Sequence, residues 1–256
     1  MTQFITSIAH SDASTITIRE RNLVDDLIGK CTYTEMLYFL IRNRMPTPTE
    51  TRVLDACLVT LMEHGFTPSS LVARLVADSV PGQVQVAIAA GLTTVSSVFV
   101  GTMEGCADIL KQGMLEGGDP DAYCQRIIDE HRAAKRLLPG FGHPFHKPDD
   151  PRTPRLIAVA REAGVDGHYI DLLLKLSEVF DRTLGKHMTI NATGAIGALL
   201  LEIGIPVDIM RGIAVVSRAG GLIGHIMEEQ TNRTARHIWD LAEQNIPYVA
   251  ADAVID

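Results

Sequence analysis

The sequence of 256 residues lacks the features that mark membrane, secreted and metal-binding proteins. No apolar run approaches the roughly 20 residues that span a bilayer. The N-terminus has no basic segment followed by an apolar one, so we expect no signal peptide. The four cysteines, Cys31, Cys57, Cys106 and Cys124, have no CxxC spacing. They indicate reduced thiols in a cytoplasmic protein that needs no metal.

Positive charge and the common catalytic motifs are also scarce. The formal net charge is -8 and no run is rich in lysine and arginine, which argues against a nucleic-acid partner. An anionic ligand would have to be attracted by a few local arginines. The sequence has no Walker loop, no GxGxxG after a strand, no HExxH and no GxSxG. Phosphoryl transfer, dinucleotide redox chemistry, zinc hydrolysis and serine hydrolysis therefore lose support.

Helical periodicity is what the sequence does contain. In residues 49–65, TETRVLDACLVTLMEHG, apolar residues recur at i, i+3 and i+4, and Gly65 is a natural C-terminal stop. Residues 83–113 read as a buried central helix interrupted near Gly101. Only residues 4–20 alternate like a short pair of strands. The remaining expected helices cover residues 33–46, 70–80, 119–138, 155–164, 169–185, 192–204 and 210–230. The predicted fold class is mainly α with a short N-terminal β segment.

The stretch LPGFGHPFHKPDDPRTPR, residues 138–155, breaks this pattern with prolines and glycines. His143 lies between Gly142 and Pro144, and an imidazole in a rigid loop can donate or accept a proton near neutral pH. The alternative is a histidine that caps a helix end or bonds a carbonyl. We expect His146 to be structural or solvent-facing.

The same stretch contains Asp150-Pro151-Arg152. The planar donor fork of Arg152 can bind a carboxylate or phosphate bidentately. A surface salt bridge, or capping of the next helix by Asp150 or Thr153, would explain this tripeptide equally well.

Two further segments hold candidate anion ligands. His64 lies at a helix C-terminus, which favours a cation, so it could anchor an anion or simply cap the helix. Arg233 and Arg236 form either a solvated basic patch or a second pair of ligands.

Arg218 lies inside an otherwise apolar helix and is followed by Gly220 and Gly221. A buried arginine needs an anion, and the glycines permit close approach of a ligand or another helix. His225 falls on roughly the same face, and we interpret it as a packed or core histidine.

PGFGHPFHKPDDPR resembles the GFGH…DPR loop of the citrate synthase superfamily. ITIRERNLVDDLIGKCTYTEMLYFLIRNRMPT, EHGFTPSSLVARLVAD and SRAGGLIGHIMEEQ resemble other segments of that superfamily, in the same order. Within the superfamily, the short length and the motifs GHP and GLIGH most resemble those of citryl-CoA lyase and of the C-terminal lyase domain of ATP-citrate lyase. These enzymes cleave citryl-CoA into acetyl-CoA and oxaloacetate.

The resemblance implies a citrate-synthase-like helical fold with a large domain, residues 1–103 and 200–256, and a small domain, residues 104–199. It implies a cytoplasmic homodimer or homotetramer whose partners are a coenzyme A thioester and a di- or tricarboxylate. By position, His143 is the catalytic histidine, His64 binds the oxaloacetate portion and Lys147 borders coenzyme A. The implied carboxylate-holding arginines are Arg152, Arg218 and Arg236.

The sequence departs from the family pattern at two positions. Phe99 stands in place of the histidine that steadies the acetyl-CoA enolate in citrate synthases, which favours cleavage over condensation. Thr193 stands in place of the catalytic aspartate, and a hydroxyl cannot act as a carboxylate base. Either Glu104 or Glu228 substitutes, or the substrate differs, or the enzyme is slow or inactive. The flanking aspartates Asp181 and Asp208 lie in no matching motif.

The sequence thus predicts an acyl-CoA C–C lyase that acts on a citryl-CoA-like thioester by retro-Claisen cleavage, with His143 and Thr193 at the reacting centre. A condensing acyltransferase and a non-catalytic coenzyme A or carboxylate-binding homologue are the alternatives.

Overall fold

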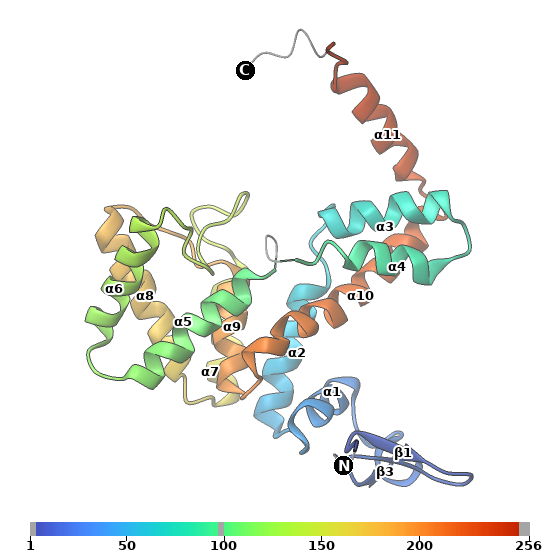
Figure 1. Ribbon diagram of the computed structural model, residues 1–256, viewed down its shortest axis with the longest axis horizontal. Helices are drawn as coiled ribbons and strands as arrows, with labels where there is room; N and C mark the ends of the chain where they lie inside the picture. Colours follow the sequence, from blue (N-terminus) through green and yellow to red (C-terminus); the bar gives the residue numbers. More distant parts are fainter. Residues whose placement is uncertain (1–3, 97–99, 251–256) are drawn as a thin grey trace. The chain divides into compact units, whose positions relative to one another are not determined.

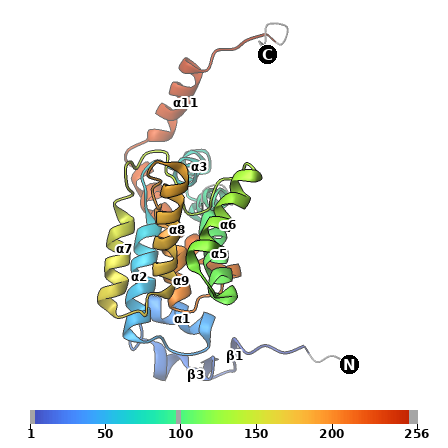
Figure 2. The same cartoon turned by 90° about the vertical axis from the view of Figure 1, so that its left-hand side faces the viewer.

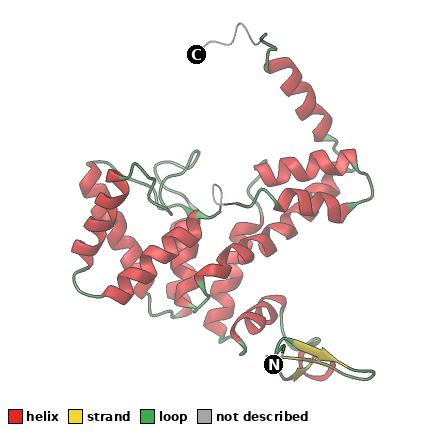
Figure 3. Cartoon of the chain, in the orientation of Figure 1, coloured by secondary structure: helices red, strands yellow, loops and turns green. Residues whose placement is uncertain are grey.

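A computed structural model describes residues 4–96 and 100–250 of the chain. Helices dominate, and the described strands lie near the N-terminus (Figure 3). The chain forms two compact units, the first of Met1–Thr60 and Val100–Arg211 and the second of Leu61–Phe99 and Gly212–Asp256. The predicted mainly helical fold with a short N-terminal β segment is confirmed. The predicted split at residues 103/104 and 199/200 remains a prediction.

The first unit begins with a small antiparallel sheet. Strands β1 (Ala9–Ser11), β2 (Ile16–Ile18) and β3 (Arg21–Asn22) pair in the order β1-β2-β3. The side chain of Asp12 accepts hydrogen bonds from the backbone N–H groups of Ser14 and Thr15, each at 2.8 Å, and so closes the β1-β2 turn. A short helical turn, η1 (Leu23–Leu27), follows.

The rest of the first unit is a helical bundle around α9 (Ala192–Glu202), which contacts α5, α7 and α8 (Figures 1 and 2). Nine of the eleven residues of α9 are buried, so it is the core of this unit. Gly197 permits this packing, because a Cβ there would lie 2.8 Å from the carbonyl oxygen of Met103. The surrounding elements are α1 (Tyr33–Arg42), α2 (Pro48–Met62), α5 (Thr102–Glu116), α6 (Pro120–Ala133), α7 (Arg152–Ala163), α8 (His168–Leu184) and the turn η2 (Val207–Ile209).

The second unit is built from α3 (Pro68–Ser79), α4 (Val84–Leu92), most of α10 (Met210–Glu229) and α11 (Thr234–Asn245). Its apolar core contains Ala73, Ala87, Leu222 and Ile226. The small side chains let α3, α4 and α10 approach closely: a Cβ on Gly91 would lie 2.7 Å from the Cδ1 atom of Leu222.

Several helix ends differ from the sequence-based expectation. The 83–113 helix is interrupted near Gly101 as expected, but the break is wider, because α4 ends at Leu92 and α5 begins at Thr102. The expected 119–138 helix ends at Ala133, and Lys135 has a positive φ of 51° that an α-helix does not accommodate. Phe99, on which one family comparison depended, lies outside the described residues. Across the described ranges, every helix is too short or too polar to cross a bilayer.

Candidate active site

The loop between α6 and α7 is hydrogen-bonded to the segment that leads into α9. The backbone N–H of Gly142 donates to the carbonyl oxygen of Thr189 at 2.8 Å, and that of Asn191 donates to Gly140 at 3.0 Å. The Asn191 side-chain amide donates to the carbonyl oxygen of Gly142 at 2.9 Å. Residues about fifty positions apart in sequence therefore form one frame that holds His143.

Two glycines make this contact possible. Gly140 has a φ of 86°, in the left-handed region that favours glycine. A Cβ on Gly194 would lie 2.5 Å from the Gly140 carbonyl oxygen, and one on Gly140 would lie 2.7 Å from the Cys106 sulfur. The loop and the first turn of α9 touch backbone to backbone, which no larger residue would permit.

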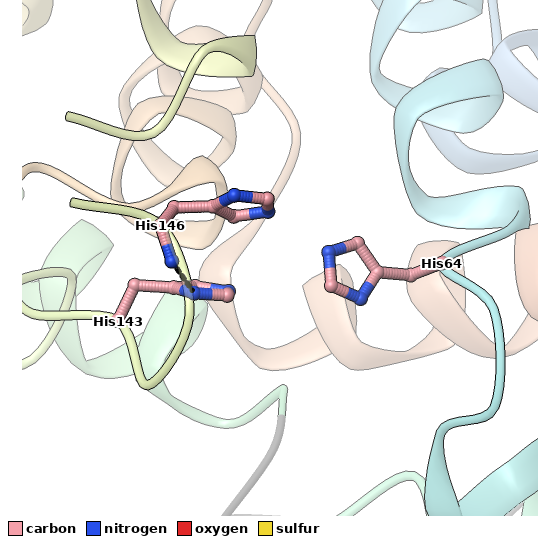
Figure 4. A group of neighbouring side chains, drawn as sticks. All are labelled: His64, His143 and His146. Atoms are coloured by element: carbon pink, nitrogen blue, oxygen red, sulfur yellow. Dashed lines mark hydrogen bonds between the residues drawn. The ribbon is translucent and has the colours of Figure 1, made fainter.

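The tautomer of His143 follows from its hydrogen bonds. Its Nδ1 accepts from the backbone N–H groups of Phe145 at 3.1 Å and His146 at 3.0 Å, the second drawn as a dashed line in Figure 4. Both partners are donors, so Nδ1 carries no proton and the neutral ring is protonated at Nε2. His143 thus presents an N–H donor from a half-buried ring.

His146 lies directly against His143. The two rings stack with centroids 4.3 Å apart and an interplanar angle of 30° (Figure 4). His146 is half-buried and supplies the N–H that orients its neighbour. The sequence predicts a structural or solvent-facing His146, but it does not predict that His146 orients His143. The three-residue spacing in a proline-bounded loop is the signal that could have suggested it.

Arg152 is paired within its own tripeptide. Its Nε donates to Asp150 Oδ1 at 2.9 Å and its Nη2 donates to Asp150 Oδ2 at 2.7 Å. Burial would raise the pKa of Asp150, but the Arg152 side chain and backbone outweigh it and lower that pKa to about 2. Asp150 also accepts from the N–H of Ala192 at 3.0 Å, which ties this pair to α9. The salt bridge that the sequence left open is present, and a ligand carboxylate would have to meet Nη1.

Thr193 occupies the first turn of α9 beside the histidine loop. Its hydroxyl donates to Asn191 Oδ1 at 2.7 Å and lies 2.8 Å from the Thr102 hydroxyl. Because the one hydroxyl proton of Thr193 points to Asn191, Thr102 must donate to Thr193. A neutral chain from Thr102 through Thr193 to Asn191 stands where the resemblance implies a carboxylate.

The possible replacements Glu104 and Glu228, and the flanking Asp181, are each engaged in another pair. Glu104 pairs with Arg211 in the first unit, and Glu228 pairs with Arg74 in the second. Asp181 accepts from His187 Nδ1 at 2.6 Å. Asp208 and Glu104 line a hollow of about 460 Å³ beside η2.

The predicted site residues fall into two groups. His143, Lys147, Arg152 and Thr193 belong to the first unit, where Lys147 is exposed on the histidine loop. The second unit holds His64 at the end of α2, half-buried Arg218 within α10 and Arg236 on α11.

Arg236 is a partly engaged cation. Its Nε donates to Asp78 Oδ2 at 2.6 Å, and the side chain is 62% exposed. With Arg233 it lines a hollow of about 480 Å³ in the second unit. The carboxylates of Asp78 and Glu229 line the same hollow, so charges of both signs face it.

Residues 41–238 match the family described as citrate synthase, C-terminal domain. The chain belongs to this family. The citrate synthase of Synechocystis sp. is 26% identical over 240 residues, which cover 91% of this chain and 59% of that protein. This family member therefore spans about three fifths of the length of that curated relative.

Solved structures of other proteins share the fold of this chain. Citryl-CoA lyase from Hydrogenobacter thermophilus matches with a TM-score of 0.87 and 27% identity, over 99% of this chain and 97% of that one. ATP citrate lyase from Methanothrix soehngenii, solved with citrate and coenzyme A, matches with a TM-score of 0.77 and 19% identity. That match covers 100% of this family member and 42% of the lyase chain.

Proposed function

We propose that this family member is a C–C lyase that cleaves a citryl-CoA-like thioester into an acetyl-CoA-type product and an oxaloacetate-like 2-oxo acid. The observation that supports the proposal most is the end-to-end match with citryl-CoA lyase, whose chain has nearly the same extent.

Retro-Claisen cleavage moves negative charge from one oxygen to another. The tertiary hydroxyl gives its proton to water, and its oxygen becomes that of a ketone as the bond to the CH₂ beside the thioester breaks. The electrons of that bond form the thioester enolate. The enolate then takes up a proton at carbon. Donors that are already fixed in place stabilise such developing charge most effectively.

The Nε2–H group of His143 is suited to the first oxygen. A neutral donor held by two backbone N–H groups at Nδ1 can hydrogen-bond the hydroxyl oxygen and stabilise the alkoxide as the C–C bond breaks. We assign the ligand carboxylates to Arg152, Arg218 and Arg236, with His64 on the oxaloacetate portion. We assign the coenzyme A border to Lys147.

Thr193 limits the second half of this reaction. Its hydroxyl is already a donor to Asn191 and can return no proton without being replenished. We therefore propose that protonation of the enolate is the slow step. We also propose that the reaction needs no metal ion.

The same Thr193 favours a second candidate, a homologue that binds coenzyme A thioesters or carboxylates without turnover. A condensing acyltransferase is the third, since both directions pass through the same alkoxide and enolate. On the resemblance we further propose a cytoplasmic homodimer or homotetramer, whose mass light scattering would measure.

One experiment separates the three candidates. The purified protein is incubated with citryl-CoA, and released oxaloacetate is reduced by malate dehydrogenase while NADH loss is recorded. The reverse assay follows free thiol released from acetyl-CoA and oxaloacetate. We expect NADH loss in the first assay. Thiol release alone would indicate a condensing enzyme, and binding of citryl-CoA without either signal would indicate the non-catalytic homologue.

A further inference from the structure

The second unit contains a buried cation whose partners extend to His64. Arg74 on α3 is 1% exposed, and its Nη1 donates to Glu229 Oε2 at 2.9 Å while Nη2 pairs with Glu228. Burial would lower the pKa of Arg74, but the two carboxylates outweigh it and hold that pKa above its ordinary value. Arg74 is therefore a permanent positive charge at a fixed place.

The third nitrogen of Arg74 decides the tautomer of His225. The Nε–H of Arg74 donates to His225 Nδ1 at 2.9 Å. A proton at that Nδ1 would face a guanidinium donor, so the neutral ring must carry its proton on Nε2. His225 Nε2 lies 2.9 Å from Glu63 Oε1 and consequently donates to it.

Glu63 connects the His225 ring to the residues after α2. The same Oε1 atom accepts from the backbone N–H of His64 at 2.8 Å and of Gly65 at 2.6 Å. Burial would raise the pKa of Glu63, but the bonds from His225 and the two backbone groups outweigh it and lower that pKa below its ordinary value. An ionised oxygen thus gathers three donors, one from His225 and two from the backbone around His64.

A glycine on α10 makes the link possible. A Cβ on Gly221 would overlap the carbonyl oxygen of Met62 and lie 2.9 Å from Glu63 Oε2. The sequence left open whether this glycine admits a ligand or another helix, and it admits the end of α2. Because α10 comes this close, the ring of His225 reaches Glu63 directly, with 11% of its side chain exposed.

We infer that Arg74, His225 and Glu63 form a positioning chain for His64, which fixes the backbone from which its imidazole meets a carboxylate ligand. The inference rests on the proposed function for the ligand only. If these residues only stabilised the fold, the ion pairs of Arg74 with Glu228 and Glu229 would be enough to compensate its buried charge. The branch through His225 instead ends on the amide groups of His64 and Gly65.

Two substitutions at His225 test the chain. In His225→Gln the carboxamide can still accept from Arg74 and donate to Glu63, whereas His225→Leu removes both bonds. Met227→Gln is the matched control, because Met227 lies on the same helix with 67% exposure. Should His225→Leu fail to fold, Glu63→Ala removes the acceptor from a side chain that is 44% exposed.

The first measurement is hydrogen–deuterium exchange at the His64 and Gly65 amides, and the second is the Kd for oxaloacetate by calorimetry. We expect the two amide exchange rates and the Kd for oxaloacetate to rise about tenfold in His225→Leu. Loss of a hydrogen bond to a charged group changes an equilibrium constant by about that factor. Both should stay near wild type in His225→Gln and Met227→Gln. With citryl-CoA, KM should rise in His225→Leu while kcat changes little.

Unchanged exchange and Kd in a folded His225→Leu protein, with only a lower Tm, would overturn the inference. A wild-type protein that neither binds oxaloacetate nor cleaves citryl-CoA would instead refute the proposed function. In that case the amide exchange rates still show whether the positioning chain of Arg74, His225 and Glu63 holds the backbone of His64 in place.

Discussion

Hydrogen bonds from neighbouring groups fix the tautomers of two histidines in this protein. Two N–H groups fix His143 as an Nε2–H donor, and a guanidinium fixes His225 in the same tautomer. A histidine with a fixed tautomer loses little free energy to reorganisation when charge develops on a bound oxygen. Thr193 is the residue that departs from this scheme, because it offers a neutral hydroxyl where charge or a mobile proton is needed.

Thr193→Asp tests that departure. We expect kcat for citryl-CoA cleavage to rise about tenfold or more, because a carboxylic acid can protonate the enolate while a hydroxyl cannot. The measurement is the coupled oxaloacetate assay at saturating substrate.

Thr193→Asn is the matched control, because it has nearly the same shape without an ionisable group. Its kcat should not exceed that of wild type. Equal or lower rates for both variants would show that enolate protonation does not depend on this position.

At the scale of elements, the histidine loop and α9 act as one unit through their glycine contact. Gly194→Ala would force a Cβ to within 2.5 Å of the Gly140 carbonyl oxygen. We expect a loss of about 1–3 kcal/mol in the free energy of unfolding from overpacking. Because His143 would shift with the loop, kcat should fall by about 100-fold. Urea denaturation and the coupled assay measure the two effects.

Gly212→Ala provides the comparison for Gly194→Ala. A Cβ at Gly212 meets nothing within 4 Å, so the added methyl should raise helix stability by up to about 1 kcal/mol. If both variants behave alike, the close contact of the loop with α9 is not what holds His143.

His187 connects the histidine loop with α8. Its Nδ1 bonds Asp181 and its Nε2 bonds Asp149 at 2.9 Å, and both carboxylates raise the pKa of His187 above 6.5. A raised folded-state pKa contributes stability that is fully present below pH 6.5 and is lost as the pH rises through the folded value. We expect the Tm advantage of wild type over His187→Gln to shrink as the pH rises above 6.5.

High salt should reduce the same advantage, because the His187 side chain is 46% exposed. A Tm difference for His187→Gln that is constant across pH would contradict the assignment.

Local features of the fold were predictable from sequence, and long-range ones were not. Periodicity indicated the helices, and the Gly-Pro pattern indicated the loop around His143. The bonds of Asn191 to that loop and of His225 to Glu63 join residues about 50 and 160 positions apart. No pattern within a helical window carries such pairings. Likewise, the sequence predicted that the Arg152 guanidinium can bind a carboxylate bidentately. That Asp150 supplies this carboxylate depends on its burial, which the sequence does not show.

At the scale of the whole molecule, a protein with a net charge of -8 must bind a multiply charged anion through local groups. Cationic candidates occur in both units, with Arg152 and Lys147 in the first and Arg218 and Arg236 in the second.

We propose that His143 stabilises the alkoxide during citryl-CoA cleavage, and the kcat of His143→Ala, measured together with its affinity for citryl-CoA, tests this role. His146→Ala is the control, because its backbone N–H still donates to Nδ1. We expect kcat to fall by about 10²–10⁴-fold in His143→Ala, with citryl-CoA still bound, and to stay near wild type in His146→Ala. Cleavage by His143→Ala at the wild-type rate would show that His143 does not stabilise the reacting oxygen.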